Sequence, residues 1–289
     1  MKKKILIIGY GYVGGYLYER LTHNKNCDVT IVKREFLDYS NSTEVEGWLR
    51  TKKDHFNYII NCSGFTGRPN VDEGEKKPEL CYELNTFTPL RISNLCKTYN
   101  IGYIHISSGC IYTGYDHPFS EDEEPNFGLF NPESSTYSKS KHAFELGSDY
   151  GLILRVRMPF CDKLHDRSYL TKILKYNNLI NNVNSKTYIP QLLDFIEHVL
   201  DKGYNTRKKD IVNFVHPNAL ATDAITELMK AYDLKNPKWE WVTFDDLNCA
   251  ANRSNCVMSV EKLQTEYKFN IWDEEVAIQS ALTNIITDE

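Results

Sequence analysis

Short apolar runs alternate with stretches of helical periodicity along the first part of the chain. Near-continuous apolar runs are typical of strands buried on both faces, and the runs expected as strands are 4–8, 28–32, 57–63, 102–108 and 151–159. Apolar residues recur at helical spacing between these runs, most clearly in 84–100 and 135–147. Strands that alternate with helices form parallel sheets. The pattern therefore predicts an α/β fold with a Rossmann-like, doubly wound parallel sheet.

The periodicity weakens after residue 160. Residues 190–203 are expected as an amphipathic helix and 210–217 as a strand, and both would return to the first layer. We therefore predict a Rossmann domain made of residues 1–160 and about 190–217. The remaining segments, about 161–189 and 218–289, are predicted to form a smaller C-terminal substrate-binding lobe.

Composition and charge restrict the kind of partner. The chain of 289 residues has a net charge of −5, whereas a protein that neutralises many phosphates is normally basic. No apolar run approaches the length of a membrane span, and the apolar stretch after the initial MKKK is too short for a signal peptide. We therefore expect a cytoplasmic protein with neither a nucleic-acid nor a membrane partner.

The eight cysteines do not form a metal-binding pattern. None of them belongs to a CxxC pair, and the histidines are scattered. Zinc sites usually show paired ligands at short spacing. We expect no metal and no disulfide framework.

A glycine-rich turn follows the first predicted strand. Gly9, Gly11 and Gly14 match G-x-G-x-x-G, with Tyr12 and Val13 at the start of the next helix. In this motif the first glycine makes the turn, the second admits a pyrophosphate and the third packs helix against strand. The helix N-terminus offers free N–H groups to the anion. The sequence predicts a dinucleotide site here.

The end of the second predicted strand selects between cofactors. An NAD site usually has an acidic residue there, whereas this chain has Lys33 and Arg34. Two cations suit the extra phosphate of NADPH, although a solvated charge pair is the alternative and NADH stays possible. Asp38 lies slightly too far along to be the usual ribose acid.

Tyr137 and Lys141 are four residues apart on a predicted helix, so both lie on one face. An ammonium near a phenol favours the phenolate, so we expect Lys141 to lower the pKa of Tyr137. Ser108 ends a predicted strand. Ligands of open parallel sheets bind beyond the carboxyl ends of the strands, so Ser108 is placed to donate a hydrogen bond to a substrate carbonyl.

The glycine loop, Ser108, Tyr137 and Lys141 together resemble the extended short-chain dehydrogenases/reductases that act on nucleotide sugars. The resemblance implies that a nicotinamide gives a hydride to a carbonyl while Tyr137 gives a proton and Lys141 binds the nicotinamide ribose. It also places several further residues in the cofactor site, namely Cys62, Ser63, Gly64, Asn85 and Pro159.

Local motifs resemble a narrower group. They are GRPNVD (67–72), SSGCIY…DHPF…EDEEPNF (107–127), YSKSK (137–141), LRVRMP (154–159), YLTKI (169–173) and RSNCVMSVEKL (253–263). In this order they resemble the UDP-4-keto-6-deoxy-glucose 3,5-epimerase/4-reductases of UDP-L-rhamnose synthesis, known from the C-terminal part of plant rhamnose synthases and from giant viruses. The resemblance implies a bifunctional oxidoreductase and isomerase that converts UDP-4-keto-6-deoxy-D-glucose to UDP-L-rhamnose with NADPH. A 4,6-dehydratase would act upstream as the pathway partner.

Cys110 lies two residues after Ser108 on an extended segment, so both side chains are expected on the same side. A thiol beside a cation is a plausible base for the acidified protons at C3 and C5 of a 4-keto sugar. The resemblance pairs this cysteine with a lysine in YLTKI, which is Lys172. A buried core cysteine and an exposed helix lysine are the alternatives.

Three further residues are expected at the substrate. Arg68 and Asn70 lie in a loop at the carboxyl edge of the sheet, and Arg253 resembles the family arginine that contacts the pyrophosphate of the sugar nucleotide. Solvated surface residues are the alternative for all three.

Two rival functions remain on the same fold. One is a simple 4-keto-reductase similar to dTDP-4-dehydrorhamnose reductase, and the other is a non-enzymatic regulatory subunit. The nucleotide of the substrate, UDP, dTDP or GDP, stays open. We expect a homodimer.

Overall fold

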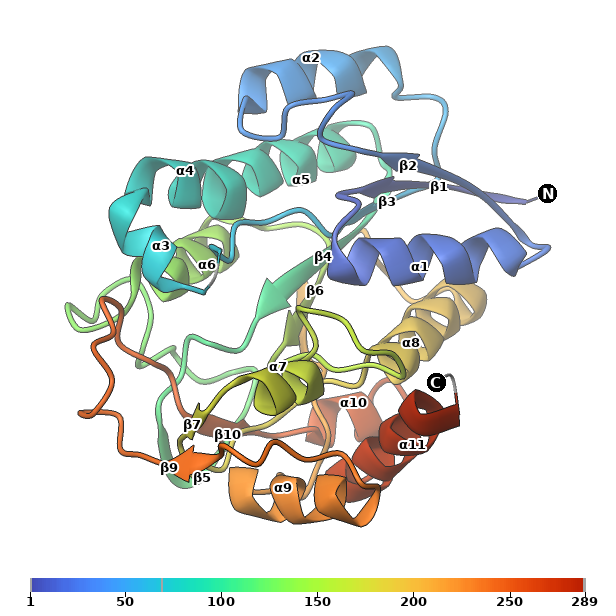
Figure 1. Ribbon diagram of the computed structural model, residues 1–289. Helices are drawn as coiled ribbons and strands as arrows, with labels where there is room; N and C mark the ends of the chain where they lie inside the picture. The colour runs from blue at the N-terminus through green and yellow to red at the C-terminus, as the bar shows by residue number, and fades with distance from the viewer. Residues whose placement is uncertain (1, 69, 288–289) are drawn as a thin grey trace.

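The computed structural model describes residues 2–68 and 70–287. Its central sheet has six parallel strands in the order β2-β1-β3-β4-β6-β8 (Figure 1). These strands are β1 (Lys3–Ile8), β2 (Cys27–Val32), β3 (Tyr58–Asn61), β4 (Gly102–Ser108), β6 (Leu152–Val156) and β8 (Asp210–Asn213). The predicted α/β fold with a Rossmann-like parallel sheet is confirmed.

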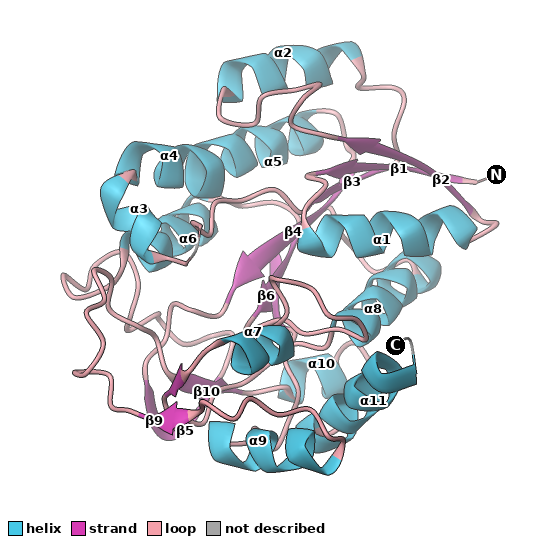
Figure 2. Cartoon of the chain, in the orientation of Figure 1, coloured by secondary structure: helices cyan, strands magenta, loops and turns pink. Residues whose placement is uncertain are grey.

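Helices cover both faces of the sheet, and the alternation of side chains along β1 explains how (Figure 2). Ile5 and Ile7 belong to one buried cluster with Leu17, while Leu6 and Ile8 belong to a second cluster on the other face. The first cluster includes side chains of α1 (Tyr12–His23) and α8 (Ile189–Lys202). The second includes side chains of α2 (Ser42–Thr51), α5 (Thr88–Thr98) and α6 (Thr136–Gly147).

A third buried cluster lies in the C-terminal part of the chain. It joins α7 (Tyr169–Lys175), α9 (Thr222–Ala231) and α11 (Glu274–Thr287). The predicted boundaries of the two domains stay a prediction, although β8 pairs with β6 in the central sheet as expected for 210–217. None of the helices in 2–68 and 70–287 is long and apolar enough to cross a membrane.

Short elements outside the central sheet complete the chain. Two small parallel sheets are formed by β5 (Gly114–Phe119) with β10 (Cys256–Met258) and by β7 (Asn178–Leu179) with β9 (Glu240–Trp241). The short helices are α3 (Asp72–Lys76), α4 (Pro78–Tyr82) and α10 (Glu261–Thr265). The single helix expected over 84–100 begins instead as a π-helical turn, η1 (Glu83–Phe87), before α5.

A buried ion pair joins α6 to the sheet. Arg155 of β6 donates to the carboxylate of Glu145 on α6 at 2.7 and 3.0 Å, and both side chains are at most 3% exposed. The other oxygen of Glu145 accepts from Ser107 of β4 at 2.8 Å. Arg155 also donates to the Tyr112 hydroxyl at 2.9 Å. The pair therefore fixes α6 against the ends of β4 and β6.

Breaking this pair from one side should destabilise the fold strongly. Arg155→Met leaves the Glu145 carboxylate buried without a cation, so we expect the free energy of unfolding to fall by roughly 3–5 kcal/mol. The double variant Arg155→Met/Glu145→Leu should lose clearly less, because no buried charge is left. Chemical denaturation measures both. Arg50→Met, at an exposed ion pair, is the matched control, and an equal loss in all three variants would contradict the expectation.

Candidate active site

A cleft of about 1440 Å³ opens at the carboxyl edge of the central sheet. Most of the residues expected in the site line it: Gly11, Tyr12, Val13, Arg34, Cys62, Ser63, Gly64, Arg68, Asn70, Ser108, Cys110, Tyr137, Lys141, Pro159, Lys172 and Arg253. Four expected residues do not line it, namely Gly9, Gly14, Lys33 and Asn85. The cleft therefore brings together the predicted cofactor, catalytic and substrate residues.

The glycine loop is built by close backbone contacts. Gly9 has a φ of +101°, and a Cβ there would lie 2.7 Å from the backbone nitrogen of Ser63. A Cβ on Gly14 would lie 1.9 Å from the carbonyl oxygen of Gly9. Gly11, which caps α1, has nothing within 4 Å of its Cβ position. The loop thus leaves space at the N-terminus of α1, where an anion is favoured, and it fits a dinucleotide.

The two cations after β2 lie differently. Arg34 lines the cleft, is half exposed and has its Nε 3.5 Å from Asp38. Lys33 places its ammonium 4.4 Å from the ring centroid of Tyr10 instead. Arg34 is therefore the better placed of the two to meet a phosphate.

Asn85 lies behind the cleft wall. Its side chain accepts from the backbone N–H of Phe65 at 2.8 Å and donates to the Phe65 carbonyl at 2.9 Å. It also donates to Ser140 of α6 at 3.1 Å. The π-helical turn that carries Asn85 thus holds the loop after β3 against α6, so this residue shapes the predicted cofactor site from outside it.

Ser108, Tyr137 and Lys141 converge on the cleft from two elements. Ser108 is the last residue of β4, and the other two share one face of α6. That helix begins at Thr136 because Ser135 caps it and accepts from the backbone N–H of Ser138 at 3.1 Å. All three side chains are at most 9% exposed.

Burial dominates the protonation of this group. It raises the pKa of Tyr137 well above the ordinary value, and Cys110 adds to the increase, while a hydrogen bond with Ser108 opposes it. Burial also lowers the pKa of Lys141 to about 8. The expected lowering of the Tyr137 pKa by Lys141 is therefore wrong for this structure, because desolvation outweighs the favourable charges. A protonated phenol suits a proton donor.

Cys110 is half buried and follows a crowded glycine. A Cβ on Gly109 would lie 2.2 Å from the sulfur of Met258, so a side chain at this position would have to displace the Met258 side chain of β10. The backbone N–H of Cys110 donates to the Ser108 hydroxyl at 3.2 Å, and its carbonyl accepts from Ser138. The thiol thus lies on a segment that is fixed on both sides and lines the cleft beside Ser108.

Lys172 lies on α7 and lines the same cleft as Cys110. Burial lowers its pKa, and Arg167 lowers it further. Arg167 itself donates to Thr66 at 3.1 Å and to the carbonyl of Gly67 at 3.0 Å. Arg167 was not predicted from the sequence, where no motif marks it.

The predicted substrate residues lie on two loops that are joined by an unpredicted acid. Arg253 makes an ion pair with Asp72 at 2.8 Å, and Asp72 also accepts from the backbone N–H of Ala251 at 3.0 Å. Asn70 accepts from the backbone N–H of Asp72 at 2.9 Å. Arg68 is exposed and lines the same cleft. Asp72 therefore fixes these loops together beside the cleft.

The cleft is cationic although the chain is acidic overall. Its described lining contains two carboxylates, Glu19 and Glu73, and eight cationic residues, which are Arg34, Arg68, Lys77, Lys141, Arg157, Arg167, Lys172 and Arg253. Such a lining favours an anionic ligand such as a dinucleotide or a nucleoside diphosphate sugar. The described residues hold no group of three or more His, Cys, Asp or Glu placed for a metal.

Replacing Lys141 by methionine tests the burial of its ammonium. Because the pKa falls from an ordinary 10.5 to about 8 on folding, the protonated lysine destabilises the folded chain below pH 8. This cost disappears as the pH rises from 8 to 10.5. We expect Lys141→Met to raise the free energy of unfolding by about 3 kcal/mol at pH 7 and to match the wild-type chain above pH 10.5. Urea denaturation at both pH values measures the difference.

Lys139→Met, on the same helix but with an exposed ammonium, is the control and should change stability little at either pH. The account would be refuted if the difference in free energy of unfolding between Lys141→Met and the wild-type chain were the same at both pH values.

Comparisons with known proteins agree with the fold and the site. Residues 3–286 match the RmlD substrate binding domain family. The trifunctional UDP-glucose 4,6-dehydratase/UDP-4-keto-6-deoxy-D-glucose 3,5-epimerase/UDP-4-keto-L-rhamnose-reductase of Arabidopsis thaliana is 31% identical over 284 residues. The match covers 91% of this chain and 39% of that protein, so the chain spans about two fifths of its relative.

Two solved structures share the fold over nearly the whole chain. The UDP-rhamnose synthase of Acanthamoeba polyphaga mimivirus has a TM-score of 0.85 at 23% identity, covering 99% of this chain and 100% of that one. The dTDP-4-dehydrorhamnose reductase of Bacillus anthracis in complex with NADP has a TM-score of 0.82 at 17% identity, covering 100% of both chains. The resemblance drawn from the motifs is thus confirmed at the level of the family: the chain belongs to the RmlD substrate binding domain family of extended short-chain dehydrogenases/reductases.

Proposed function

We propose that the chain is a bifunctional 3,5-epimerase/4-keto-reductase that converts UDP-4-keto-6-deoxy-D-glucose to UDP-L-rhamnose with NADPH. One observation carries the proposal: Cys110 and Lys172 line the same cleft as Ser108, Tyr137 and Lys141. A reductase needs only the last three. A thiol and a second lysine beside them supply the acid and base that epimerisation needs.

Epimerisation begins with proton removal beside the carbonyl. The thiolate of Cys110 takes the proton from C3, and later from C5, so that a thiol and an enolate form. The ammonium of Lys172 then returns a proton to the opposite face of the sugar and becomes a neutral amine. A proton passes from the thiol to the amine through solvent before the next cycle, which restores both groups. The lowered pKa of Lys172 helps it to act as an acid near neutral pH.

The hydroxyls of Ser108 and Tyr137 stabilise the negative charge that develops on O4. The same contacts serve the reduction. When bound, the reduced nicotinamide supplies a hydride to C4. Tyr137 gives its phenolic proton to O4, and the adjacent Lys141 stabilises the phenolate that remains. Epimerisation comes first, because reduction removes the carbonyl that makes the C3 and C5 protons acidic.

The proposed substrate is the product of a 4,6-dehydration. A 4,6-dehydratase activity appears in the name of the trifunctional plant relative, and we place such an enzyme upstream of this chain. The second candidate function is 4-keto-reduction alone, which is favoured by the structural similarity to a dTDP-4-dehydrorhamnose reductase. In that case Cys110 is chemically inert.

Deuterium exchange separates the two functions. The chain is incubated with the 4-keto sugar nucleotide in heavy water without cofactor, and NMR follows deuterium at C3 and C5. We expect both positions to exchange, and Cys110→Ala to slow the exchange by roughly 10²–10⁴-fold while it still reduces a substrate that is already epimerised. Cys249→Ala, at another cysteine of the cleft, is the matched control and should exchange normally. If the wild-type chain shows no exchange at C3 and C5, the epimerase function is rejected and 4-keto-reduction alone remains as the proposed function.

Arg34→Ala tests the choice of NADPH. Removing a charged contact to the 2′-phosphate should raise the KM for NADPH roughly 10- to 100-fold, with little change in the KM for NADH. Lys33→Ala is the control, because Lys33 does not itself line the cleft and its ammonium lies over the ring of Tyr10. Equal effects of Arg34→Ala on both cofactors, measured by steady-state kinetics, would speak against phosphate recognition here.

A further inference from the structure

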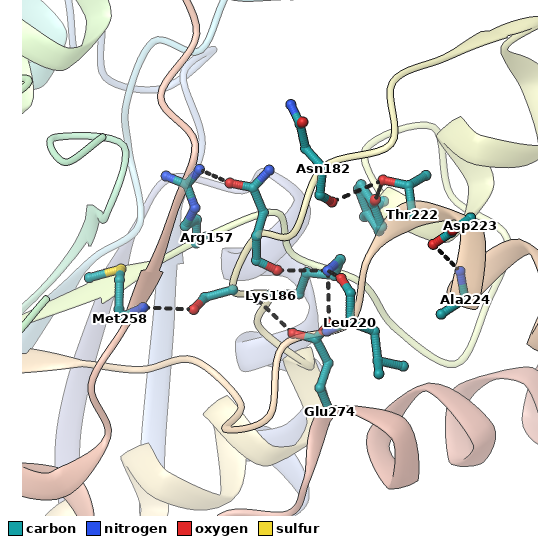
Figure 3. A network of polar contacts seen from close by, with 12 residues as sticks. Arg157, Asn182, Lys186, Leu220, Thr222, Asp223, Ala224, Met258 and Glu274 are labelled. Atoms are coloured by element: carbon teal, nitrogen blue, oxygen red, sulfur yellow. Dashed lines mark hydrogen bonds and ion pairs between the residues drawn. The ribbon is translucent and has the colours of Figure 1, made fainter. Parts of the chain in front are cut away.

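Arg157 is a buried cation directly behind the Cys110 segment. It is the first residue after β6, is 1% exposed and contributes to the cleft wall. Its guanidinium donates to the carbonyl of Gly109 at 3.2 Å, to the hydroxyl of Ser254 at 2.8 Å and to the carbonyl of Ser254 at 2.7 Å. It also donates to the side-chain oxygen of Asn184 (Figure 3). Every one of these acceptors is neutral.

The charge of Arg157 is not paired within the described part of the chain. No carboxylate there lies within 4.0 Å of it, and its buried Nε has no hydrogen-bond partner. Two neighbouring buried cations do have counter-ions, since Arg155 pairs with Glu145 at 2.7 Å and Lys186 with Glu274 at 2.8 Å. Burying a charge without a counter-ion is costly, so the fold keeps an unneutralised positive charge at this place.

The surroundings hold Arg157 rigidly. Its backbone N–H donates to Thr187 at 3.0 Å, and the next residue, Met158, has a φ of +38°, in the left-handed region that non-glycine residues rarely adopt. Behind it, the ammonium of Lys186 donates to the Asn184 carbonyl at 2.7 Å and pairs with Glu274 (Figure 3). The network thus fixes Asn184, which in turn fixes the guanidinium.

The field of this charge reaches the reacting groups. Arg157 acts to lower the pKa of Tyr137 and of Cys256, against the larger effect of burial in both cases. The titratable groups that interact with Cys110 from other elements are Tyr137 and Lys141 on α6 and Cys256 on β10. Lys141 is only partly charged near pH 8, whereas a guanidinium stays charged at every working pH.

We propose that Arg157 is the positioning residue of the epimerase half-reaction: it fixes the Gly109 carbonyl so that Cys110 faces the cleft, and it keeps an unpaired positive charge directly behind the segment that carries the thiol. This inference rests on the proposed function, and it assigns the electrostatic support of the Cys110 segment to a fixed charge as well as to Lys172.

Asn184→Asp tests the proposal without enlarging or shrinking any side chain. The new carboxylate keeps the oxygen that accepts from Arg157 and gives the guanidinium a counter-ion. The readout is alkylation of Cys110 by iodoacetamide in the full chain without substrate, followed against pH by mass spectrometry of the Cys110 peptide. Because the new carboxylate neutralises the charge behind the thiol segment, we expect alkylation of Cys110 at pH 7 to slow about 10-fold. Alkylation of Cys249 in the same sample is the internal reference.

Three further variants separate charge from shape. Arg157→Met should reproduce the slow alkylation, and Arg157→Lys, which keeps the charge, should stay near the wild-type profile. Asn182→Asp adds the same charge to the cleft wall and should leave the profile in place. A folded Asn184→Asp chain that alkylates Cys110 as fast as the wild type would overturn the proposal, whether or not the Arg157 variants fold.

The same variants distinguish this inference from the function it rests on. If the wild-type chain exchanges deuterium at C3 and C5, Asn184→Asp should slow that exchange about 10-fold while reduction of an epimerised substrate continues. Exchange that is unaffected in Asn184→Asp contradicts the role of Arg157 alone. Slow alkylation in Asn184→Asp combined with no exchange in the wild type contradicts the epimerase function alone.

Discussion

The parallel arrangement of the six central strands is the constraint on which the site depends. Because all strands run the same way, their carboxyl ends meet at one edge. Gly9 follows β1, Ser63 follows β3, Ser108 ends β4 and Arg157 follows β6. Residues far apart in the sequence therefore line one cleft, and α6 adds Tyr137 and Lys141 from the side.

Burial then gives these residues their chemical properties. The dry surroundings that keep the Tyr137 phenol protonated also lower the pKa of Lys141. Two arginines at the same edge differ in their partners: Arg155 has a counter-ion in Glu145, whereas the acceptors of Arg157 among the described residues are all neutral. The Arg155–Glu145 pair fixes α6 against the sheet. The unpaired charge of Arg157 leaves a positive potential at the cleft, where an anion can form.

Local sequence signals predicted the residues that belong to one element or to one turn. The glycine loop, the spacing of Tyr137 and Lys141 and the apolar runs of the sheet report local geometry, and the structure has all of them. The strand β5 was missed, because its polar residues and Pro118 resemble a loop and its pairing partner, β10, lies far along the chain. The pKa of Tyr137 was misjudged, because burial depends on tertiary packing that no spacing reports. Arg157 lay inside a recognised motif, but only the structure shows that it has no counter-ion within residues 2–68 and 70–287.

The contact between Gly109 and Met258 has a consequence for folding during synthesis on the ribosome. A ribosome releases the glycine loop and the first four strands of the sheet long before β10 emerges. The contacts of the Cys110 segment and of Arg157 with Met258 and Ser254 can form only after these late residues have been synthesised. The glycine loop can therefore form early in synthesis. The contacts that orient the Cys110 side chain form only when nearly the whole polypeptide has been made.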